Sequence, residues 1–478
     1  MKNQPFYITT TLPYVNAQPH VGFAGELILT DVRARFARDL GYEVVFNTGT
    51  DEHGVKIYEK ALEAGKDPQA YVDEYAAKFD DLKALLNISN THFVRTTDET
   101  HIAAATEIWK RVDAKGFIYK KQYSVKYCNG CELEKTDSEL EDGFCPVHPG
   151  KDLALIEEEN YFFKFAEFAD KLLSLYNEQP DFVYPSSKMN EIRSFVENGL
   201  QDFSISRVKE KMPWGVPVPG DDTQVMYVWF DALTSYISTL GWPSDDDNFT
   251  KYWGTKDNPQ AIQTAGKDNL RQQSAMWQAM LMAADLPRSK QIFIGGFISV
   301  DGKKMSKSIG NVIAPSEMVS RYGVDGTRYL LLTKVSFGDD SDISWDKMDA
   351  KYNADLANGL GNLTSRIITL AEGISYDVPT VDLEALKSDI QKCETKAALE
   401  KVWGIVDRAN KLMEEKQPWS LKKKEDKISQ VEYKELMERF LQDLHIIATY
   451  IKPFLPETSE KIFAQLESRE KEILFVRV

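Results

Sequence analysis

The sequence predicts an α/β protein whose doubly wound parallel sheet is followed by an all-α helical bundle. Three observations predict this fold. Strand and helix patterns alternate along the first 50 residues, they return between residues 225 and 298, and only helical patterns follow residue 346. Alternating strands and helices are typical of a parallel sheet with crossover helices, whereas consecutive amphipathic helices pack as a bundle.

The first strand–helix–strand unit occupies about 45 residues. Residues 6–11 are rich in β-branched and aromatic side chains and are expected to form a buried strand. Residues 24–40 carry apolar side chains at helical spacing, and Gly41 follows where a left-handed cap would end the helix. A second strand is expected at 42–46. Ligands bind at the carboxyl ends of parallel strands, so the polar loops after these strands are candidate binding loops.

The next region predicts two helices and then an insertion. One helix begins at Asp67-Pro68, an N-cap followed by proline, and the other covers residues 99–115. Residues 117–149 then combine strand-like fragments, many charges and three of the four cysteines. This change of composition indicates an inserted module. A Pro/Gly-rich boundary at 214–220 follows it.

The second half of the sheet is expected after this boundary, and the bundle after the sheet. The expected elements are a strand at 225–230, a helix at 271–284, a strand at 292–294, and helices at 352–372, 383–413 with an interruption, and 428–454.

Composition and charge limit the function classes. The chain has 478 residues, which exceeds one ordinary core, and 42 % hydrophobic and 28 % charged residues, as in soluble globular proteins. The N-terminal residues lack the basic and apolar segments of a signal peptide, and no apolar run approaches the roughly 20 residues of a membrane helix. We therefore expect a cytoplasmic protein without a membrane partner.

The net charge of −16 argues against a protein that coats nucleic acid, because such proteins are usually basic. The charge is unevenly distributed, since residues 351–478 contain 20 basic and 22 acidic residues. The helical region is therefore the less repulsive surface for a phosphate backbone, which is weak support for RNA binding there.

The spacing of three cysteines and one histidine predicts a metal site. Cys128 and Cys131 form a C-x-x-C pair, and after thirteen intervening residues Cys145 and His148 form a C-x-x-H pair. Four soft ligands in two pairs match a tetrahedral structural Zn²⁺ site. The alternative is three buried thiols beside an unrelated histidine, and a disulfide is disfavoured without a secretion signal. Cys393 is expected in the core.

Two loops are suited to binding a nucleotide. Residues 13–23 join a strand to a helix through a turn that contains Gly22, where free backbone N–H groups can contact phosphate. Residues 301–308 contain Lys303, Lys304 and Lys307, which can neutralise negative charge that develops on a triphosphate. A solvated lysine loop without function is the alternative.

In this order the two loops resemble the signature motifs of the class I aminoacyl-tRNA synthetases. His20-Val21-Gly22-Phe23 stands where the family carries His-Ile-Gly-His, and Lys304-Met305-Ser306-Lys307-Ser308 matches the second motif. The resemblance covers most of the chain and is strongest to the methionyl-tRNA synthetases. Phe23 departs from the pattern, because it replaces the second histidine.

The resemblance implies five regions. They are the first half of a Rossmann-type catalytic domain at 1–116, an insertion at 117–224 with a zinc knuckle at about 127–150, the second half of the catalytic domain at 225–298, the lysine loop and stem-contact region at 299–350, and a helical anticodon-binding domain at 351–478.

The reaction that the resemblance implies has two steps. L-Methionine reacts with ATP, accompanied by Mg²⁺, to give methionyl-adenylate and pyrophosphate, and methionine then passes to the 3′ end of elongator or initiator tRNA-Met. The implied catalytic residues are His20, Lys304 and Lys307. The implied ATP-binding residues are Pro13, His20, Gly22, Phe23, Gly266, Asp268, Lys304 and Lys307. A lone histidine in a loop is otherwise more often structural.

The resemblance also implies an amino-acid pocket. Its residues are Leu12, Tyr14, Asp51, Trp229, Ala232, Leu233, Tyr236, Asn269 and Gln273. Asp51 would hold the substrate ammonium group, and aromatic side chains suit a polarizable thioether. Without the resemblance, Asp51 would be interpreted as a capping residue and the apolar members as core. Asn269 and Gln273 depart from the family, where an apolar residue and a histidine are usual.

Asn362 and Arg366 lie one helical turn apart, and Trp419 follows near a helix end. An amide, a guanidinium and an indole can hydrogen-bond and stack with unpaired bases. The resemblance makes these residues readers of a CAU anticodon, whereas such a pair on a helix is otherwise usually a solvated face. Because no further domain follows the bundle, we expect a monomer.

Two other functions fit the sequence less well. A class I synthetase for another apolar or sulfur-containing amino acid is disfavoured by Trp229, Tyr236 and Trp419, and no large editing module fits between residues 116 and 225. A non-catalytic tRNA-binding relative would explain Phe23 and Gln273. It is disfavoured because the catalytic residues named above are retained.

Overall fold

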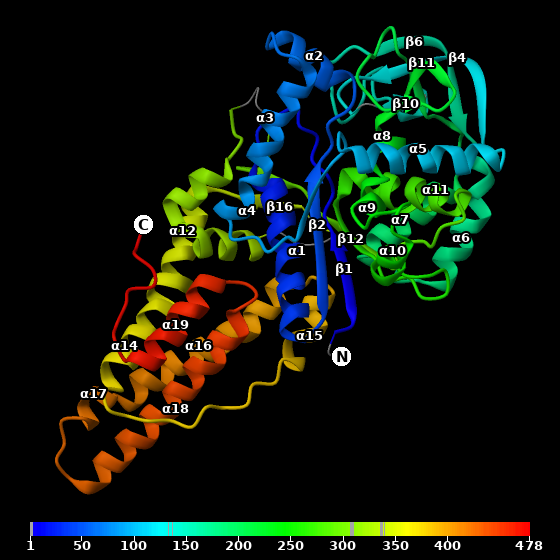
Figure 1. The fold of residues 1–478 in the computed structure, drawn as a ribbon. Coiled ribbons are helices and arrows are strands. Elements are labelled where there is room, and N and C mark those ends of the chain that lie inside the picture. Colours follow the sequence, from blue (N-terminus) through cyan, green and yellow to red (C-terminus); the bar gives the residue numbers. More distant parts are fainter. Residues whose placement is uncertain (1–2, 132, 136, 306–309, 335–337, 339) are drawn as a thin grey trace.

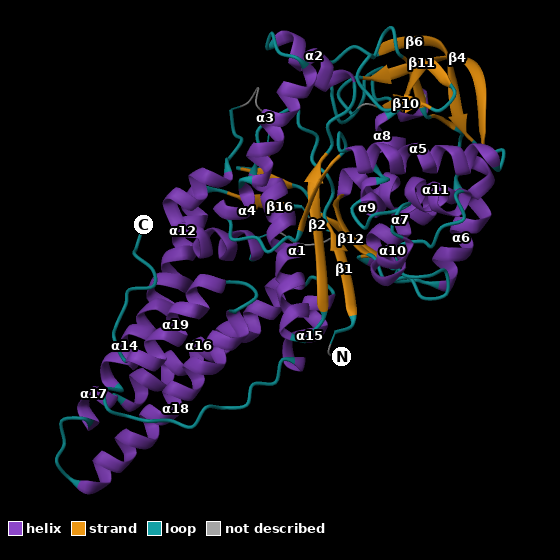
Figure 2. Cartoon of the chain, viewed as in Figure 1, coloured by secondary structure: helices purple, strands orange, loops and turns teal. Residues whose placement is uncertain are grey.

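A six-stranded parallel sheet lies at the centre of the molecule (Figure 1, Figure 2). The computed structural model describes residues 3–131, 133–135, 137–305, 310–334, 338 and 340–478. The strands are arranged in the order β3-β2-β1-β12-β13-β7, and neighbours pair in parallel. Their bounds are β1 Pro5–Thr9, β2 Glu43–Thr50, β3 His92–Arg95, β7 Val183–Tyr184, β12 Ile262–Gly266 and β13 Gln291–Gly295.

The strand order reverses between β1 and β12. From β1 the chain proceeds outward through β2 to β3, and it later returns beside β1 as β12 before proceeding outward to β13. The loops after β1 and β12 therefore leave in opposite directions and open a crevice, which is the usual ligand site of such sheets. The predicted doubly wound parallel sheet is confirmed.

Helices cover both faces of this sheet because successive strand residues point to opposite sides. Ile8 of β1 packs in one apolar core, and its neighbour Tyr7 packs in the other. Helices on the Ile8 side are α1 Val21–Asp39, α2 Val55–Glu63, α3 Pro68–Asp80 and α4 Leu82–Leu85. Helices on the Tyr7 side are α5 Glu99–Ala114, α6 Ala169–Glu178, α7 Ser186–Glu197, α8 Val228–Ala232, α9 Ser235–Ser238, α10 Asp246–Trp253 and α11 Trp277–Ala283.

Local signals explain several helix ends. The Asp67 side chain accepts a hydrogen bond from Gln69 N at 2.9 Å and so caps α3, as predicted. Gly41 follows α1 with a φ of 85°, which is the left-handed conformation expected after a helix. Short helical turns complete this part of the chain, namely η1 Asp137–Glu139, η2 Phe165–Phe168, η3 Lys267–Asn269 and the π-helical η4 Gln272–Met276.

The insertion is built from antiparallel strands, seen at the upper right of Figure 1. One sheet has the order β5-β4-β6-β8 and the other the order β10-β11-β9. The bounds are β4 Ile118–Cys128, β5 Leu133–Lys135, β6 Ala154–Phe163, β8 Phe203–Ser204, β9 Ser206–Val208, β10 Pro217–Val218 and β11 Asp221–Met226.

The strand expected at residues 225–230 is wrong in extent and in place. β11 ends at Met226, the chain enters α8 at Val228, and β11 pairs antiparallel with β9 and β10. The end of β11 and the start of α8 are both largely buried, so the apolar pattern of residues 225–230 cannot distinguish a strand from a helix. The strand that flanks β1 on the side opposite β2 is β12, which the sequence analysis missed because Gln263 and Thr264 interrupt its apolar pattern.

A small third sheet carries the start of the lysine loop. It consists of β14 Ile298–Val300, β15 Lys303–Lys304 and β16 Ser341–Ile343. Asp301 and Gly302, with φ of 52° and 71°, form the turn between β14 and β15. An Asp-Gly pair with positive φ at both positions is typical of a tight hairpin turn. Asp342 Oδ1 accepts from Gly302 N at 2.7 Å and anchors the turn.

The C-terminal region is helical, as predicted, and extends away from the sheets (Figure 2). Its helices are α12 Pro315–Leu332, α13 Trp345–Lys351, the π-helical η5 Tyr352–Gly361, α14 Asn362–Leu370, α15 Glu384–Gln391, α16 Thr395–Lys416, α17 Pro418–Leu421, α18 Lys427–Ile451 and α19 Pro456–Ser468. The expected interruption within 383–413 separates α15 from α16, where Cys393 has a φ of 57°. Among the described residues, none of these helices has the length and apolar character that a membrane crossing requires.

A buried arginine joins the bundle to the sheet. Arg328 of α12 is fully buried, and its guanidinium lies 2.7 Å from Asp31 of α1. The same group donates to the carbonyl oxygens of Leu86 at 3.0 Å and Phe454 at 2.8 Å. One side chain therefore fixes α1, the turn after α4 and the turn after α18 relative to α12.

Candidate active site

The carboxyl ends of β1 and β12 open into two adjoining cavities of about 980 Å³ and 260 Å³. The cavities share the lining residues Thr11, His20, Phe23, Asp268, Asn269 and Phe297. Because the strand order reverses between β1 and β12, the cavities lie where this fold class binds ligands.

His20 begins α1 and lines both cavities. Its Nδ1 accepts a hydrogen bond from Gly22 N at 3.0 Å. An accepting Nδ1 carries no proton, so the neutral ring is protonated on Nε2. Desolvation by the surrounding protein lowers the pKa of His20 and so favours the neutral ring. His20 thus offers an uncharged N–H donor beside the positive end of α1.

Gly22 and Phe23 form the first turn of α1. A Cβ at residue 22 would lie 2.8 Å from the His20 ring, so the cap requires glycine. Phe23 packs edge-on against Phe79 of α3, with ring centroids 5.7 Å apart and an interplanar angle of 71°. Both phenylalanine rings line the larger cavity. Where the signature motif carries a second histidine, this chain therefore presents an aromatic pair.

The other residues predicted to bind ATP lie around the same cavities. Pro13 lines the larger cavity, Gly266 lines the smaller one, and Asp268 lines both. Gly266 ends β12, and Asp268 follows in η3. The end of the missed strand β12 therefore brings this motif beside the His20 loop.

The sequence analysis missed one carboxylate in this region, Glu26. It lies on α1 one turn after Phe23 and lines the smaller cavity. Glu26 Oε1 accepts from Thr11 N at 2.8 Å and from Thr11 Oγ1 at 2.7 Å. Burial raises the pKa of Glu26 to about 7, although the hydrogen bonds from Thr11 oppose the shift. The signal that would have found Glu26 is its spacing of three residues from Phe23 on one helix face.

The raised pKa of Glu26 predicts a pH-dependent stability. The folded state holds this proton up to about pH 7, whereas an unfolded glutamate loses it near pH 4.3. The stabilisation that Glu26 contributes is fully present below about pH 4.3. It is lost as the pH rises toward about 7. Glu26→Gln keeps an oxygen acceptor, so it should match the original chain near pH 4.5 and exceed its stability by on the order of 1–3 kcal/mol at pH 8.

Thermal unfolding across this pH range measures the effect, with the original chain and Glu26→Gln compared at each pH. A constant difference between the two would contradict the assignment of the raised pKa to Glu26.

The lysine loop begins beside the His20 stretch. Lys304 belongs to β15, while the placement of its side chain and of Lys307 lies outside the described residues. Met305 lines the smaller cavity, and its Cε is 3.5 Å from the position of a Cβ on Gly22. The two nucleotide motifs therefore meet at one cavity although almost 300 residues separate them.

The residues predicted for the amino-acid pocket fall into two groups. Leu12, Tyr14, Asp51, Trp229 and Asn269 line the larger cavity. The second group lies behind this surface and is buried. Its members are Ala232, Leu233, Tyr236 and Gln273.

Backbone pairing holds Asp51 at the cavity. Its N–H donates to Pro13 O at 3.0 Å, and its carbonyl accepts from Val15 N at 3.1 Å. A β-bridge thus joins Tyr14 to Asp51, and the end of β2 lies against the loop after β1. Asp51 is 6 % exposed, so its carboxylate is largely desolvated, where a charged partner is held more strongly.

A buried cluster that sequence reasoning missed lies behind this pocket. Asp231 accepts from His53 Nδ1 at 2.6 Å and from His101 Nε2 at 2.7 Å. Asp231 and His101 are fully buried, and His53 is 5 % exposed. Burial raises the pKa of Asp231, but the two histidines outweigh this and lower it to about 2. The partners are 130 and 178 residues from Asp231, so no local pattern predicts the cluster.

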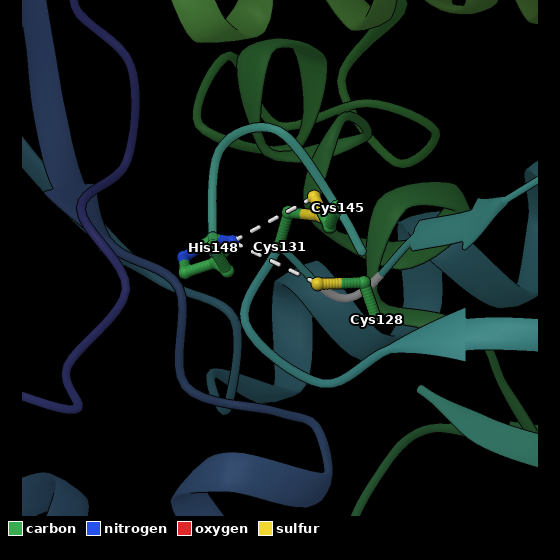
Figure 3. Close-up of side chains that lie close together, drawn as sticks. All are labelled: Cys128, Cys131, Cys145 and His148. Atoms are coloured by element: carbon green, nitrogen blue, oxygen red, sulfur yellow. Dashed lines mark hydrogen bonds between the residues drawn. The ribbon is translucent and has the colours of Figure 1, made fainter. Parts of the chain in front are cut away.

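The four predicted metal ligands come together (Figure 3). Their ligand atoms lie within 4.8 Å of one another. Cys131 Sγ and Cys145 Sγ are 3.8 Å apart, and His148 Nδ1 is 3.7 Å from Cys128 Sγ. A tetrahedron with Zn–S bonds of about 2.3 Å has S···S edges of about 3.8 Å. The cluster can therefore hold a metal ion, and its spacing fits zinc.

The metal cluster borders the larger cavity, because Cys131 and His148 line it. Lys56 of α2 donates a hydrogen bond to Gly130 O, between the first two cysteines. The insertion is therefore held against the helix that follows Asp51, and it forms one wall of the cavity.

Comparisons with known proteins agree with this geometry. A family model described as "tRNA synthetases class I (M)" matches residues 6–155 and 149–368. The methionine–tRNA ligase of Clostridium acetobutylicum is 40 % identical over 484 residues, covering 97 % of this chain and 74 % of the relative. That of Brucella suis is 38 % identical over 485 residues, covering 97 % and 92 %. The chain belongs to the class I methionyl-tRNA synthetase family.

Solved structures of this family have the same fold along the whole chain. A methionyl-tRNA synthetase of Mycobacterium tuberculosis in complex with methionyl-adenylate gives a TM-score of 0.91 at 35 % identity, covering 99 % of this chain and 98 % of that one. The free-state enzyme gives 0.84 at 33 % identity, covering 100 % and 98 %. Sheet, insertion and bundle are therefore all common to this chain and the methionyl-tRNA synthetases.

The residues predicted to read the anticodon lie together on the bundle. The Arg366 guanidinium lies over the Trp419 ring, 4.9 Å from its centroid, and pairs with Glu414 at 2.5 Å. Asn362 is exposed on the same helix as Arg366, one turn earlier. A cation therefore lies over an aromatic plane, and an exposed amide lies one turn away on the same helix.

Proposed function

We propose that this chain is a methionine–tRNA ligase that forms methionyl-adenylate from L-methionine and ATP and then transfers methionine to tRNA-Met. One observation carries the proposal. The chain is similar over 99 % of its length to a methionyl-tRNA synthetase that holds methionyl-adenylate, and its His20 loop, Asp51 and lysine hairpin meet at one crevice.

Adenylate formation needs alignment and charge neutralisation more than it needs an acid or base. The methionine carboxylate attacks the α-phosphate, and pyrophosphate leaves. In our proposal, the His20 Nε2–H and the backbone at the start of α1 donate to phosphate oxygens, while Pro13, Gly22, Phe23, Gly266 and Asp268 contact the rest of ATP. Lys304 and Lys307 would neutralise the developing charge together with the Mg²⁺ that accompanies ATP.

Methionine binding is proposed on the Asp51 side of the larger cavity. The Asp51 carboxylate would pair with the substrate ammonium, which places the substrate carboxylate toward the nucleotide. The apolar and aromatic pocket residues named above would surround the thioether, which offers few polar handles. Asn269 and Gln273 complete this pocket in the proposal.

We propose that elongator and initiator tRNA-Met bind along the bundle, with Asn362, Arg366 and Trp419 on the anticodon. The clustering of a guanidinium over an indole supports this, because unpaired bases stack on such groups. We further propose that the chain works as a monomer in the cytoplasm.

We propose that Cys128, Cys131, Cys145 and His148 hold one structural Zn²⁺. Four protein donors leave no position open, so the ion would stabilise the insertion at the cavity wall and take no part in the chemistry. Cys145→Ser should reduce bound zinc from about one equivalent to near zero, because the thiolate set is broken. Metal analysis of the purified protein measures this. Cys393→Ser alters a buried thiol outside the cluster and should keep the metal, whereas unchanged zinc in Cys145→Ser would refute the site.

The Phe23–Phe79 pair leads to a further prediction. Phe23→His restores the family's residue and still fills most of the aromatic site, so adenylate formation should persist, with kcat/KM for ATP within about tenfold of the original chain. ATP–pyrophosphate exchange measures this. A variant that folds but shows no exchange would mean that the nucleotide site depends on the phenylalanine ring.

Methionine-dependent ATP–pyrophosphate exchange, tested across the amino acids, decides the function. Exchange with methionine and charging of tRNA-Met are expected. Exchange with leucine or cysteine but not methionine would favour another class I specificity, and tRNA binding without exchange would favour the non-catalytic relative.

A further inference from the structure

A third cavity of about 270 Å³ opens beside the larger one, along α7. Its walls include Glu191, Ile192, Phe195, Asn198, Leu270 and Arg271. Glu191 and Arg271 also line the larger cavity, so the two spaces adjoin at these side chains. The third cavity therefore lies next to the crevice and outside the space that we assign to ATP and methionine.

An arginine stacked on a phenylalanine forms one wall of the third cavity. The guanidinium carbon of Arg271 lies 4.4 Å from the centroid of the Phe195 ring. Arg271 Nη1 donates to Glu139 Oε1 of the insertion at 3.0 Å, so α7 and the insertion hold the guanidinium from two sides. Its side chain is nevertheless 53 % exposed, and a guanidinium has five N–H donors. The wall thus presents a positioned, partly open cation beside an aromatic ring.

The other walls combine buried apolar side chains with an exposed amide. Ile192 and Leu270 are buried. Asn198 is exposed at the end of α7, and its side chain has no hydrogen-bond partner among the described residues. An aromatic ring, a guanidinium and an amide are the groups that bind an unpaired nucleic-acid base, through stacking and through hydrogen bonds to its edge. The third cavity therefore has the chemistry of a base-binding site.

The proposed transfer step brings single-stranded RNA to the mouth of the larger cavity. The 3′-terminal ribose hydroxyl of tRNA forms an ester bond with the methionyl carbonyl carbon, the bond from that carbon to the phosphate oxygen breaks, AMP leaves, and the hydroxyl proton passes to solvent. The terminal nucleotide must therefore enter the larger cavity. The nucleotide before it stays within one phosphodiester link of that cavity, which is where the third cavity adjoins it.

We propose that the third cavity binds the base of the nucleotide next to the 3′ end of tRNA-Met, stacked on the Phe195–Arg271 pair and with the Asn198 amide at the base edge. The inference rests on the proposed function. The fork of Arg271 has donors for Glu139 and for the phosphate between the last two nucleotides. Phe195, Arg271 and Asn198 are positioning residues, because they hold the terminal ribose at the adenylate and do not touch the reacting atoms.

The carboxylates at this site are neutralised by pairing within the chain. Glu139 pairs with Arg271, and Glu191 pairs with Lys188 at 2.6 Å. Lys188 also lines the larger cavity. Two cations therefore balance two carboxylates at the mouth, although the chain as a whole carries a net charge of −16. We expect stacking to supply most of the affinity at such a balanced site.

Phe195→Leu tests the site because it removes the ring and keeps an apolar side chain. Aminoacylation is measured with a tRNA-Met transcript and with the same transcript carrying an abasic nucleotide next to its 3′ end. For the original chain, the abasic change should lower kcat/KM for tRNA about five- to thirtyfold, since the stacking of one base is lost. For Phe195→Leu, both transcripts should react at a similar, lowered kcat/KM, within about twofold of each other.

ATP–pyrophosphate exchange without tRNA separates this role from adenylate formation. The exchange rate of Phe195→Leu should stay within about twofold of the original rate, because Phe195 lines only the third of the three cavities among the described residues. Phe195→Tyr retains a ring and should restore the difference between the transcripts. Asn198→Ala alters an exposed amide, so it leaves the fold intact, and it should narrow that difference about two- to fivefold.

Phe117→Leu provides a matched control. Phe117 is a half-buried ring between α5 and β4, and Lys171 Nζ lies 6.0 Å from its centroid. This variant should keep the full difference between the two transcripts. An abasic transcript that reacts as well as the intact one with the original chain would overturn the site, and so would a difference of full size in Phe195→Leu. If the original chain shows no methionine-dependent exchange, the proposed function fails instead.

Discussion

Arg328→Met is expected to lower the free energy of unfolding by about 3–5 kcal/mol, the usual cost of removing one partner from a buried ion pair. Methionine fills the volume of the arginine stem but donates no hydrogen bond. Asp31 would lose one of its two arginine partners and keep Arg35, and the carbonyl oxygens of Leu86 and Phe454 would remain buried without this donor. Urea unfolding measures the loss.

Arg321 on the same helix gives a matched control. Its side chain is 45 % exposed and pairs with Asp349, so Arg321→Met should cost less than about 1 kcal/mol. Equal losses in the two variants would contradict the assigned role of Arg328. Arg328→Lys keeps the charge but has fewer donors, and it should give an intermediate loss.

Asp231→Leu is expected to lower the free energy of unfolding by a similar amount, about 3–5 kcal/mol. The substitution removes the common acceptor of His53 and His101, and it leaves two imidazoles buried with one partner fewer. A second effect is expected on substrate binding. Asp231 follows Trp229 by two residues and His53 follows Asp51 by two residues, so the cluster holds two sides of the proposed methionine pocket together.

Asp231→Asn separates the two effects. The amide retains one acceptor, so the stability loss should fall to about 1–2 kcal/mol. KM for methionine should still rise in this variant, while KM for ATP stays near its original value. Thermal unfolding and exchange kinetics measure the two quantities. An Asp231→Leu variant with unchanged stability would refute the cluster as a structural element.

Local patterns predicted the elements that have helical apolar spacing or a local end signal. The helix of residues 24–40 was predicted from apolar spacing and Gly41, and the structure has α1 at Val21–Asp39. The bundle helices were also predicted from apolar spacing, since each buries one apolar stripe. The metal cluster was predicted because its four donors lie in two short pairs.

The same patterns failed where a buried segment changes from strand to helix and where buried polar residues interrupt a strand. An apolar run at 225–230 was interpreted as one strand, although a strand end and a helix start share it. Strand β12 was missed because Gln263 and Thr264 are buried polar residues that hydrogen bonds across the fold satisfy. The Asp231 cluster joins residues more than 100 positions apart, and such contacts exist only once the fold is formed.

The joint around Arg328 has a consequence for substrate size. The sheet and the bundle share one continuous apolar core and this buried guanidinium, and both contacts oppose a hinge motion of the bundle about the catalytic half. We therefore expect the separation between Trp419 and His20 to vary little. On the proposed function, a tRNA with a lengthened or shortened arm would have to bend to reach both ends, and the energy of that bending would itself select among tRNAs.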